Sequence, residues 1–274
     1  MDERYDVAIL GGGNLGTALA RGWVAAGRVD ASRTAVTRRH PSKLQELADA
    51  GYAVGADNVA AVQGASLLVL AVQPQQLGAL MAEIAPHLEP GRHHVVSVVS
   101  GASIAAMRAG LGGTVPVVRA MPNTAVLIGE SMTCLAADEV DADALAQAVE
   151  LFDLVGETLV IAEEMMVPAT ALCACGVAFF LRCVRAASQG GIEIGFHPEE
   201  ALLLAAQTAR GAATLAMREG THPEHEIDRV TTPRGCTITG LNEMEHQGLS
   251  SAMIKGIVAS ARAAAGLYSA KADG

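Results

Sequence analysis

Hydrophobic residues up to position 160 occur in short runs, and turn-forming residues separate most of these runs. Such runs predict buried strands, and a 3.6-residue hydrophobic period between them predicts helices. The predicted strands are residues 6–10, 34–37, 53–54, 67–71, 94–97, 116–120, 131–136 and 157–160. The predicted helices are 15–26, 41–50, 75–85, 104–109 and 141–154. Strands that alternate with helices indicate an α/β fold with a Rossmann-type, doubly wound parallel sheet.

The hydrophobic pattern changes after residue 162. From residue 165 onward it is helical in period, over 165–188, 198–219 and 237–271, with a break near Gly248. We therefore predict two domains, residues 1–162 with the sheet and residues 163–274 as an all-α domain. The run 165–181 has no charged residue, but Pro168 and Gly176 interrupt it. We interpret it as a buried helix at a subunit interface, not as a membrane span.

Composition narrows the function classes. The formal net charge is −10, and the longest basic cluster is Arg38-Arg39, which argues against nucleic acid or an anionic membrane as partner. The five cysteines form no C-x-x-C pair, so we predict reduced thiols and no metal site. The charged N-terminal residues do not resemble a secretion signal, and we expect a cytoplasmic protein.

A glycine-rich turn follows the first predicted strand. Gly11, Gly13 and Gly16 form the pattern G-x-G-x-x-G, with Asn14 and Leu15 at the start of the next helix. In a dinucleotide site the first glycine permits the turn, the second admits the pyrophosphate and the third lets the helix pack on the strand. The alternative is a tight turn that binds no ligand. The strand before it and the helix after it favour the dinucleotide.

Arg38 and Arg39 follow the second predicted strand, where an NAD site typically has an acidic residue for the ribose. Arginine at this point favours a 2′-phosphate, so we predict NADP(H) as the preferred cofactor, with NAD(H) possible. Asn58 is a candidate for the adenosine end. The alternatives are a solvated arginine pair and an ordinary turn asparagine.

Two further loops follow predicted strands at the edge where a doubly wound sheet binds its ligand. Asn123 and Thr124 would face the nicotinamide, although Pro-Asn is also a good turn. The predicted cofactor contacts in these loops are Ala71, Val72, Gln73, Pro74, Met121, Pro122 and Asn123.

The helical half contains a loop with candidate substrate chemistry. Thr232, Gly235, Cys236 and Thr237 lie where a loop leads into a helix, so free backbone N–H groups and hydroxyls come together. Such a loop suits a small carboxylate. The alternative is an ordinary helix cap.

These loops together resemble the pyrroline-5-carboxylate reductase family over nearly the whole chain. The matching segments are Gly11 to Gly16, Ala71 to Gln75, Arg119 to Thr124, Gly190 to Ile192 and Thr231 to Ile238. The resemblance implies a Rossmann domain, a helical dimerisation domain and homo-oligomers. It also implies NAD(P)H-dependent reduction of 1-pyrroline-5-carboxylate to proline, with the carboxylate on Thr232, Gly235, Cys236 and Thr237, across a subunit interface from the nicotinamide. Thr237 is our candidate catalytic residue, with its hydroxyl near the imine nitrogen.

Several positions depart from the family pattern. Gln73 stands where the family often has Lys, Arg234 replaces a glycine, and residues 173–179 replace Ser-Gly-Ser-Gly-Pro-Ala-Tyr. We therefore keep two alternatives, a reductase of other imines or small acids and a catalytically silent NADP-binding protein. A hydroxyacid reductase of this architecture would need a lysine on the helix after the last strand, and the predicted helix 165–188 has none.

Overall fold

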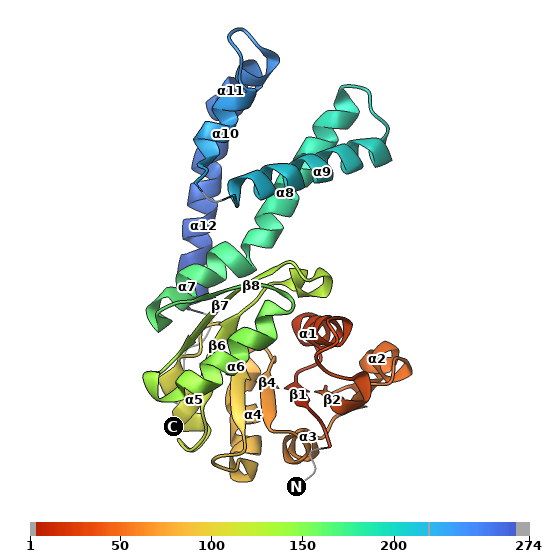
Figure 1. Ribbon diagram of the computed structural model, residues 1–274, viewed down its shortest axis with the longest axis vertical. Coiled ribbons are helices and arrows are strands. Elements are labelled where there is room, and N and C mark those ends of the chain that lie inside the picture. Colours follow the sequence, from red (N-terminus) through yellow and green to blue (C-terminus); the bar gives the residue numbers. More distant parts are fainter. Residues whose placement is uncertain (1–3, 219, 267–274) are drawn as a thin grey trace. The chain divides into compact units, whose positions relative to one another are not determined.

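The computed structural model describes residues 4–218 and 220–266, which form two compact units (Figure 1). The first unit extends to Cys175 and includes the chain from Ser260, and the second is Gly176–Ala259. The segment 163–175 packs with the sheet, since Met166 and Ala169 are buried in one cluster with Met121. The first compact unit therefore extends 13 residues past the predicted domain boundary between residues 162 and 163. That boundary stays a prediction.

The first unit is built on one sheet with strand order β3-β2-β1-β4-β5-β6-β7-β8. The strands are β1 (Val7–Leu10), β2 (Thr34–Thr37), β3 (Ala53–Gly55), β4 (Leu67–Leu70), β5 (His94–Ser97), β6 (Val117–Met121), β7 (Ser131–Ala137) and β8 (Gly156–Val160). From the central strands β1 and β4 the order runs outward in both directions, through β2 to β3 on one side and through β5 to β8 on the other. This is the arrangement of a doubly wound fold. The sequence predicted each of these strands.

One strand pair departs from the expected parallel sheet. β7 runs antiparallel to β6, with Met121 opposite Cys134, while the other neighbours are parallel. The connection from Met121 to Ser131 holds only the 3₁₀ turn η4 (Thr124–Ile128). A parallel pair needs a crossover of a dozen or more residues, so this connection is too short for one. The predicted doubly wound sheet is thus confirmed and is mainly parallel, with β6–β7 as its one antiparallel pair among the described strands.

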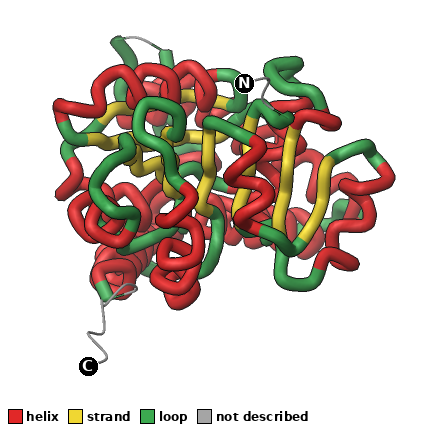
Figure 2. Tube along the Cα trace, turned by 90° about the horizontal axis from the view of Figure 1, so that it is seen from below, coloured by secondary structure: helices red, strands yellow, loops and turns green. Residues whose placement is uncertain are grey.

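Helices cover both faces of the sheet, as Figure 2 shows. They are α1 (Asn14–Ala25), α2 (Gln45–Asp49), α3 (Asn58–Gly64), α4 (Pro74–Ile84), α5 (Ile104–Gly110) and α6 (Ala142–Asp153), joined by the 3₁₀ turns η1 (Ala31–Arg33), η2 (Pro41–Leu44), η3 (Ala85–His87) and η5 (Glu139–Asp141). Alternate residues of β1 enter different cores: Ile9 packs with Trp23 and helices α1, α2 and α6, and Leu10 packs with α3, α4 and α5. Strand periodicity thus gives each face its own buried core.

The chain leaves the sheet through an irregular helical segment. It begins with the 3₁₀ turn η6 (Glu163–Met165), continues as α7 (Met166–Ala169) and then forms a π-helical turn, η7 (Thr170–Ala174). The sequence predicted one regular helix here. The Thr170 hydroxyl donates to the Met166 carbonyl at 2.8 Å, a side-chain bond of the kind that bends helices.

The regular elements of the second unit are all helices within its described residues. Its helices are α8 (Gly176–Glu193), α9 (Pro198–Ala216), α10 (Pro223–Val230), α11 (Cys236–His246) and α12 (Leu249–Ala265), the last of which ends in the first unit. Helices α8 and α9 pack closely at Gly191 and Ala201. A Cβ added to Gly191 would lie only 3.0 Å from the Cβ of Ala201. The predicted break near Gly248 is confirmed. The sequence prediction missed α10 and α3.

Large apolar side chains are exposed on the second unit. Phe180 and Leu181 on α8 are 63% and 61% exposed, and Leu203 on α9 is 70% exposed. By length and composition alone the run Glu163–Glu193 would also pass for a membrane span, and only 22% of its most apolar window is buried. Within residues 165–181 the single chain buries Met166, Ala169, Thr170, Ala171 and Gly176 and leaves the large side chains near the end of the run exposed. The place of this run at a subunit interface stays a prediction.

Candidate functional site

The glycine turn between β1 and α1 is held in a single conformation by its neighbours. Gly11 has φ 121°, and a Cβ there would lie 2.5 Å from the Ala71 carbonyl oxygen. A Cβ on Gly16 would lie 2.1 Å from the Gly11 oxygen, whereas a Cβ on Gly13 would meet no atom within 4 Å. Gly11 and Gly16 thus allow close backbone packing, and Gly13 borders open space. This division of roles is the one that the sequence predicted.

The start of α1 offers free donors beside that space. Gly13 is the N-cap without a side-chain hydrogen bond, and the first helical bond runs from the Thr17 N–H to the Gly13 carbonyl at 2.9 Å. The N–H groups of Asn14, Leu15 and Gly16 precede this bond. A helix start of this kind attracts anions, because its amide hydrogens and the helix dipole both favour negative charge.

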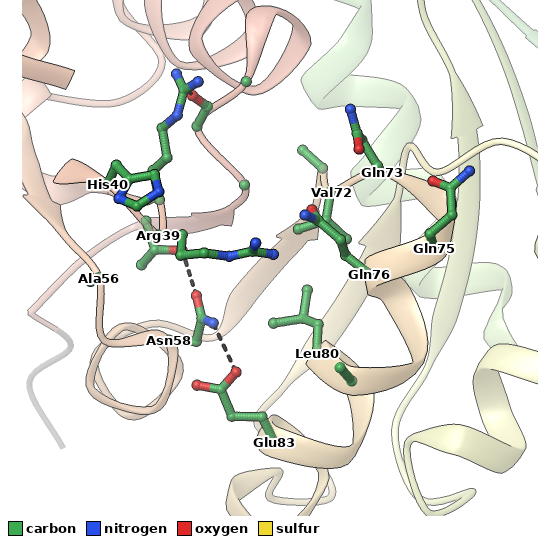
Figure 3. A pocket seen from close by; sticks show the side chains of 17 residues that line it. Arg39, His40, Ala56, Asn58, Val72, Gln73, Gln75, Gln76, Leu80 and Glu83 are labelled. Carbon is green, nitrogen blue, oxygen red and sulfur yellow. Dashed lines mark hydrogen bonds between the residues drawn. The ribbon is translucent and has the colours of Figure 1, made fainter. Parts of the chain in front are cut away.

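A pocket of about 640 Å³ opens beside the turn. Figure 3 shows side chains from β2, α3 and α4 around it. Of the predicted cofactor residues, it is lined by Gly11, Gly13, Arg38, Arg39, Asn58, Ala71, Val72 and Gln73. The loops after β1, β2 and β4 therefore meet at one edge of the sheet, as a doubly wound fold requires.

The two predicted arginines differ in their surroundings. The Arg38 guanidinium donates to the Gly12 carbonyl at 2.8 Å, which ties the end of β2 to the glycine turn. Arg39 is exposed, forms no ion pair with any described residue, and extends across the pocket toward Gln76 in Figure 3. A guanidinium with free donors is well suited to bind a phosphate.

Asn58 lies near Arg39 and takes part in a short chain of hydrogen bonds (Figure 3). The Thr37 hydroxyl donates to Asn58 Oδ1 at 2.6 Å, and Asn58 Nδ2 donates to Glu83 Oε2 at 3.0 Å (Figure 3). Thr37 is buried at the end of β2, and Glu83 is exposed near the end of α4. Both bonds fix the orientation of the Asn58 amide.

The sequence prediction missed several lining residues. One group follows helix α4, where Gln76, Leu80 and Glu83 recur every three to four residues and therefore share a face. Applying this spacing to the helix after Pro74 would have identified them. The other missed lining residues are Gly12, Thr37, His40, Ala56, Gln75 and Ala79.

Other predicted cofactor residues lie outside this lining. Asn123 has structural partners: its Oδ1 accepts from the Ala125 N–H at 2.9 Å, and its Nδ2 donates to the Cys173 carbonyl at 3.4 Å. It thus caps η4 and links it to the π-helical turn. The remaining residues outside the lining are Asn14, Leu15, Gly16, Pro74, Met121 and Pro122. Their cofactor contacts stay predictions.

Two cysteine side chains are in contact next to Asn123, whose amide bonds to the Cys173 carbonyl. The sulfur atoms of Cys134 on β7 and Cys173 on the π-helical turn are 3.7 Å apart. A hydrogen bond from the Cys134 thiol stabilises the Cys173 thiolate and lowers the pKa of Cys173. The same bond, together with burial, raises the pKa of Cys134. Of the two, Cys173 is therefore the sulfur that ionises first.

The predicted carboxylate loop lies in the second unit, between α10 and α11. Gly235 is the N-cap of α11 without a side-chain hydrogen bond, and its N–H donates to the Thr232 carbonyl at 2.9 Å. A Cβ on Gly235 would meet Thr232 Oγ1, so a larger residue there would force the Thr232 side chain to move. The exposed Cys236 and partly buried Thr237 follow as the first residues of the helix. Of the four predicted substrate residues, Thr232 and Gly235 thus lie in the loop, and Cys236 and Thr237 lie in the first turn of the helix that follows it.

The Thr237 hydroxyl forms no hydrogen bond with any residue that the structure describes. The neighbouring Thr231 and Thr239 hydroxyls are used within the chain, on the carbonyls of Ile227 (2.7 Å) and Gly235 (3.2 Å). Thr237 therefore keeps a hydroxyl free for a ligand beside a helix start that favours a carboxylate.

Arg234 has an unusual backbone conformation, with φ 61°. This left-handed region favours glycine and costs most other residues about 1–2 kcal/mol. The resemblance noted above places a glycine at this position. The chain therefore retains the backbone turn of that pattern while adding a positively charged side chain, which is exposed.

Comparison with known proteins gives two matching family models. One, described as pyrroline-5-carboxylate reductase dimerisation, matches residues 163–267. The other, described as NADP oxidoreductase coenzyme F420-dependent, matches residues 6–101. The first model thus covers the helical half of the chain. The second covers the glycine turn and strands β1 to β5.

Curated relatives resemble the chain over most of its length. It is 46% identical to pyrroline-5-carboxylate reductase 2 of Dictyostelium discoideum, covering 95% of this chain and 92% of that protein. It is 50% identical to reductase 1 of the same organism over 97% of this chain, and spans about half (51%) of that longer protein.

Solved structures share the fold. A pyrroline-5-carboxylate reductase from Coxiella burnetii is 28% identical, with a TM-score of 0.85 over 97% of this chain and 100% of the other. A Plasmodium falciparum pyrroline carboxylate reductase with NADP bound is 21% identical, with a TM-score of 0.87 over 97% and 99% of the two chains. The second likeness concerns the fold alone.

Proposed function

The chain belongs to the pyrroline-5-carboxylate reductase family, and from this premise we propose that it reduces 1-pyrroline-5-carboxylate to L-proline with NADPH. The observation that carries the proposal is its 46% identity to a named reductase over nearly the full length of both chains. The reaction is the last step of proline biosynthesis. We place it in the cytoplasm, in keeping with the acidic composition and the predicted reduced thiols.

The pocket at the sheet edge fits the coenzyme. The turn around Gly13 leaves room for a pyrophosphate next to the amides that begin α1, and Arg39 offers free donors to a 2′-phosphate. NADPH is therefore the preferred coenzyme, and NADH is also accepted. When bound, the reduced nicotinamide supplies a hydride.

The loop before α11 holds the substrate. Backbone amides at Cys236 and Thr237, with the hydroxyl of Thr232, bind the carboxylate. The Thr237 hydroxyl lies near the imine nitrogen, directly or through a water molecule. A protonated imine already accepts hydride at its C=N carbon, so the chain mainly needs to align and hold the substrate, without a strong general base.

The working form is a homo-oligomer joined through the helical half. The exposed apolar side chains of α8 and α9, such as Phe180 and Leu203, are covered by a second copy of the chain. Large exposed apolar patches on a protein in water usually mark such interfaces. The coenzyme and the imino acid are the small-molecule partners.

One assay tests the activity. The purified protein is mixed with NADPH and 1-pyrroline-5-carboxylate, and loss of the nicotinamide absorbance is followed together with proline formation. A six-membered cyclic imino acid and a small hydroxyacid with NADP⁺ serve as competing substrates. Faster turnover of either one would replace the proposed substrate, and coenzyme binding without turnover of any of them would support a silent NADP-binding protein.

A pair of variants tests the role of Thr237. Thr237→Val removes the hydroxyl at nearly constant volume, and we expect kcat to fall about tenfold or more. Thr214→Val makes the same change on α9, where the hydroxyl bonds to the Arg210 carbonyl of its own helix, and leaves kcat unchanged. Full turnover and unchanged KM in Thr237→Val would remove Thr237 from the mechanism.

A further inference from the structure

The coenzyme pocket contains a carboxylate that the family resemblance does not explain. Among the described residues that line it, Glu83 is the sole acid, alongside Arg38 and Arg39. Acidic side chains in dinucleotide sites accept hydrogen bonds from a free ribose 2′-hydroxyl, whereas arginines bind a 2′-phosphate. The pocket therefore combines features suited to both coenzymes.

Hydrogen bonding connects Glu83 with the wall of the pocket. Glu83 Oε2 accepts from Asn58 Nδ2 at 3.0 Å, and Asn58 Oδ1 accepts from the Thr37 hydroxyl at 2.6 Å (Figure 3). A carboxylate only accepts hydrogen bonds, so the Asn58 amide cannot flip without placing its oxygen against Glu83. One Nδ2 hydrogen remains for a ligand.

The charge of Glu83 is not neutralised within the described chain. It forms no ion pair there, although two arginines line the same pocket. A bound 2′-phosphate would add up to two negative charges to this pocket. Repulsion between the phosphate and the carboxylate would then oppose the attraction of the arginines, while a free 2′-hydroxyl would meet no such repulsion.

We propose that Glu83 is a specificity-determining residue that limits the preference for NADPH over NADH. Its carboxylate weakens binding of the 2′-phosphate and leaves the chain able to use both coenzymes. The inference rests on the proposed function only in taking this pocket as the coenzyme site.

The effect is expected to be moderate, because Glu83 is exposed to solvent and salt. For charges separated by water and protein at a pocket rim, we expect removal of the carboxylate to raise the NADPH-to-NADH affinity ratio roughly three- to tenfold. The change should shrink as ionic strength rises, since salt screens exposed charges.

Two substitutions separate charge from geometry. Glu83→Gln removes the charge but keeps an oxygen that accepts from Asn58, whereas Glu83→Ala removes both. Glu139→Gln, an exposed glutamate after β7 outside the pocket, is the control for net charge. Dissociation constants for NADPH and NADH are measured by nicotinamide fluorescence at low and high salt, without any imine present.

We expect Glu83→Gln and Glu83→Ala to raise the affinity ratio and Glu139→Gln to leave it unchanged. An unchanged ratio in Glu83→Gln, or an equal loss of affinity for both coenzymes, would overturn the proposal and leave Glu83 as a support for Asn58. If the unmodified protein binds neither coenzyme, the proposed function itself fails. The two failures are therefore distinguishable.

Discussion

The Glu163 carboxylate lies 3.0 Å from the guanidinium of Arg119, a side chain that is only 6% exposed. The same carboxylate oxygen accepts the Ile104 N–H at the start of α5, at 2.6 Å. Glu163 therefore joins β6, the start of α5 and the chain that leaves the sheet. Within the described residues it is the ion-pair partner of Arg119, so its loss leaves a buried charge without compensation.

We expect Glu163→Ala to lower the free energy of unfolding by about 1–3 kcal/mol, a range reduced because the glutamate side chain is 33% exposed. Glu164→Ala, an exposed neighbour in the same turn, should change it by less than about 0.5 kcal/mol. Urea unfolding of the full chain measures both. Equal losses in the two variants would show that the Arg119 contact contributes nothing measurable.

Two glycines of the turn should respond differently to alanine. Gly13→Ala places its methyl in open space at an ordinary φ of −82°, so thermal stability should be preserved while NADPH affinity falls. Gly16→Ala drives its methyl into the Gly11 carbonyl, and it should lower stability by about 1–3 kcal/mol as well as weaken coenzyme binding. Thermal melts and NADPH titrations measure these effects. Normal NADPH affinity in Gly13→Ala would mean that no ligand approaches this atom.

Alanine substitutions of the two pocket arginines should also have different effects on coenzyme affinity. Arg39→Ala removes free donors alone, so NADPH affinity should fall about tenfold while NADH affinity stays within about twofold. Arg38→Ala also breaks the bond to the Gly12 carbonyl and should weaken both coenzymes. Titration with each coenzyme tests this pair. If Arg39→Ala weakened NADH as much as NADPH, the 2′-phosphate would not be its partner.

The cysteine pair makes a prediction about pH. The hydrogen bond from Cys134 lowers the pKa of Cys173, so more of Cys173 is thiolate at neutral pH than in a free cysteine. Its alkylation by iodoacetamide should therefore rise with pH to a midpoint below about 8.5, the ordinary thiol value. Cys134→Ala removes the donor and should move the midpoint upward. Site-resolved mass spectrometry follows Cys173 separately; an unmoved midpoint would contradict the hydrogen bond.

Much of the sheet and of the coenzyme pocket follows from local sequence patterns. Strands such as β1 and β4 are buried on both sides, so they read as continuous apolar runs with turn residues at their ends. The loops after them meet because parallel strands end at one edge. Gly11, Gly13, Arg39 and Asn58 could therefore be placed together without coordinates.

The remaining features depend on packing across the chain. The direction of β7 follows from the length of its connection, which an alternating pattern of strands and helices does not reveal. Helix α10 is short and mostly polar, so it has no strong apolar period. Glu83 lies near the far end of α4, well beyond the strand end at which the sequence points. The apolar period of the run after Met165 is the same whether a core or a second chain covers it, so periodicity in one chain cannot show that Phe180 and Leu181 are exposed.

The reversed strand β7 also bears on how the chain folds. It pairs with β6 across a connection from Met121 to Ser131, and the Asn123 N–H donates to the Ser131 hydroxyl at 3.2 Å inside that connection. Closing so short a loop costs less entropy than closing a crossover through a helix. We therefore expect the β6–β7 hairpin to be an early native element of the chain, one that the parallel strands join later.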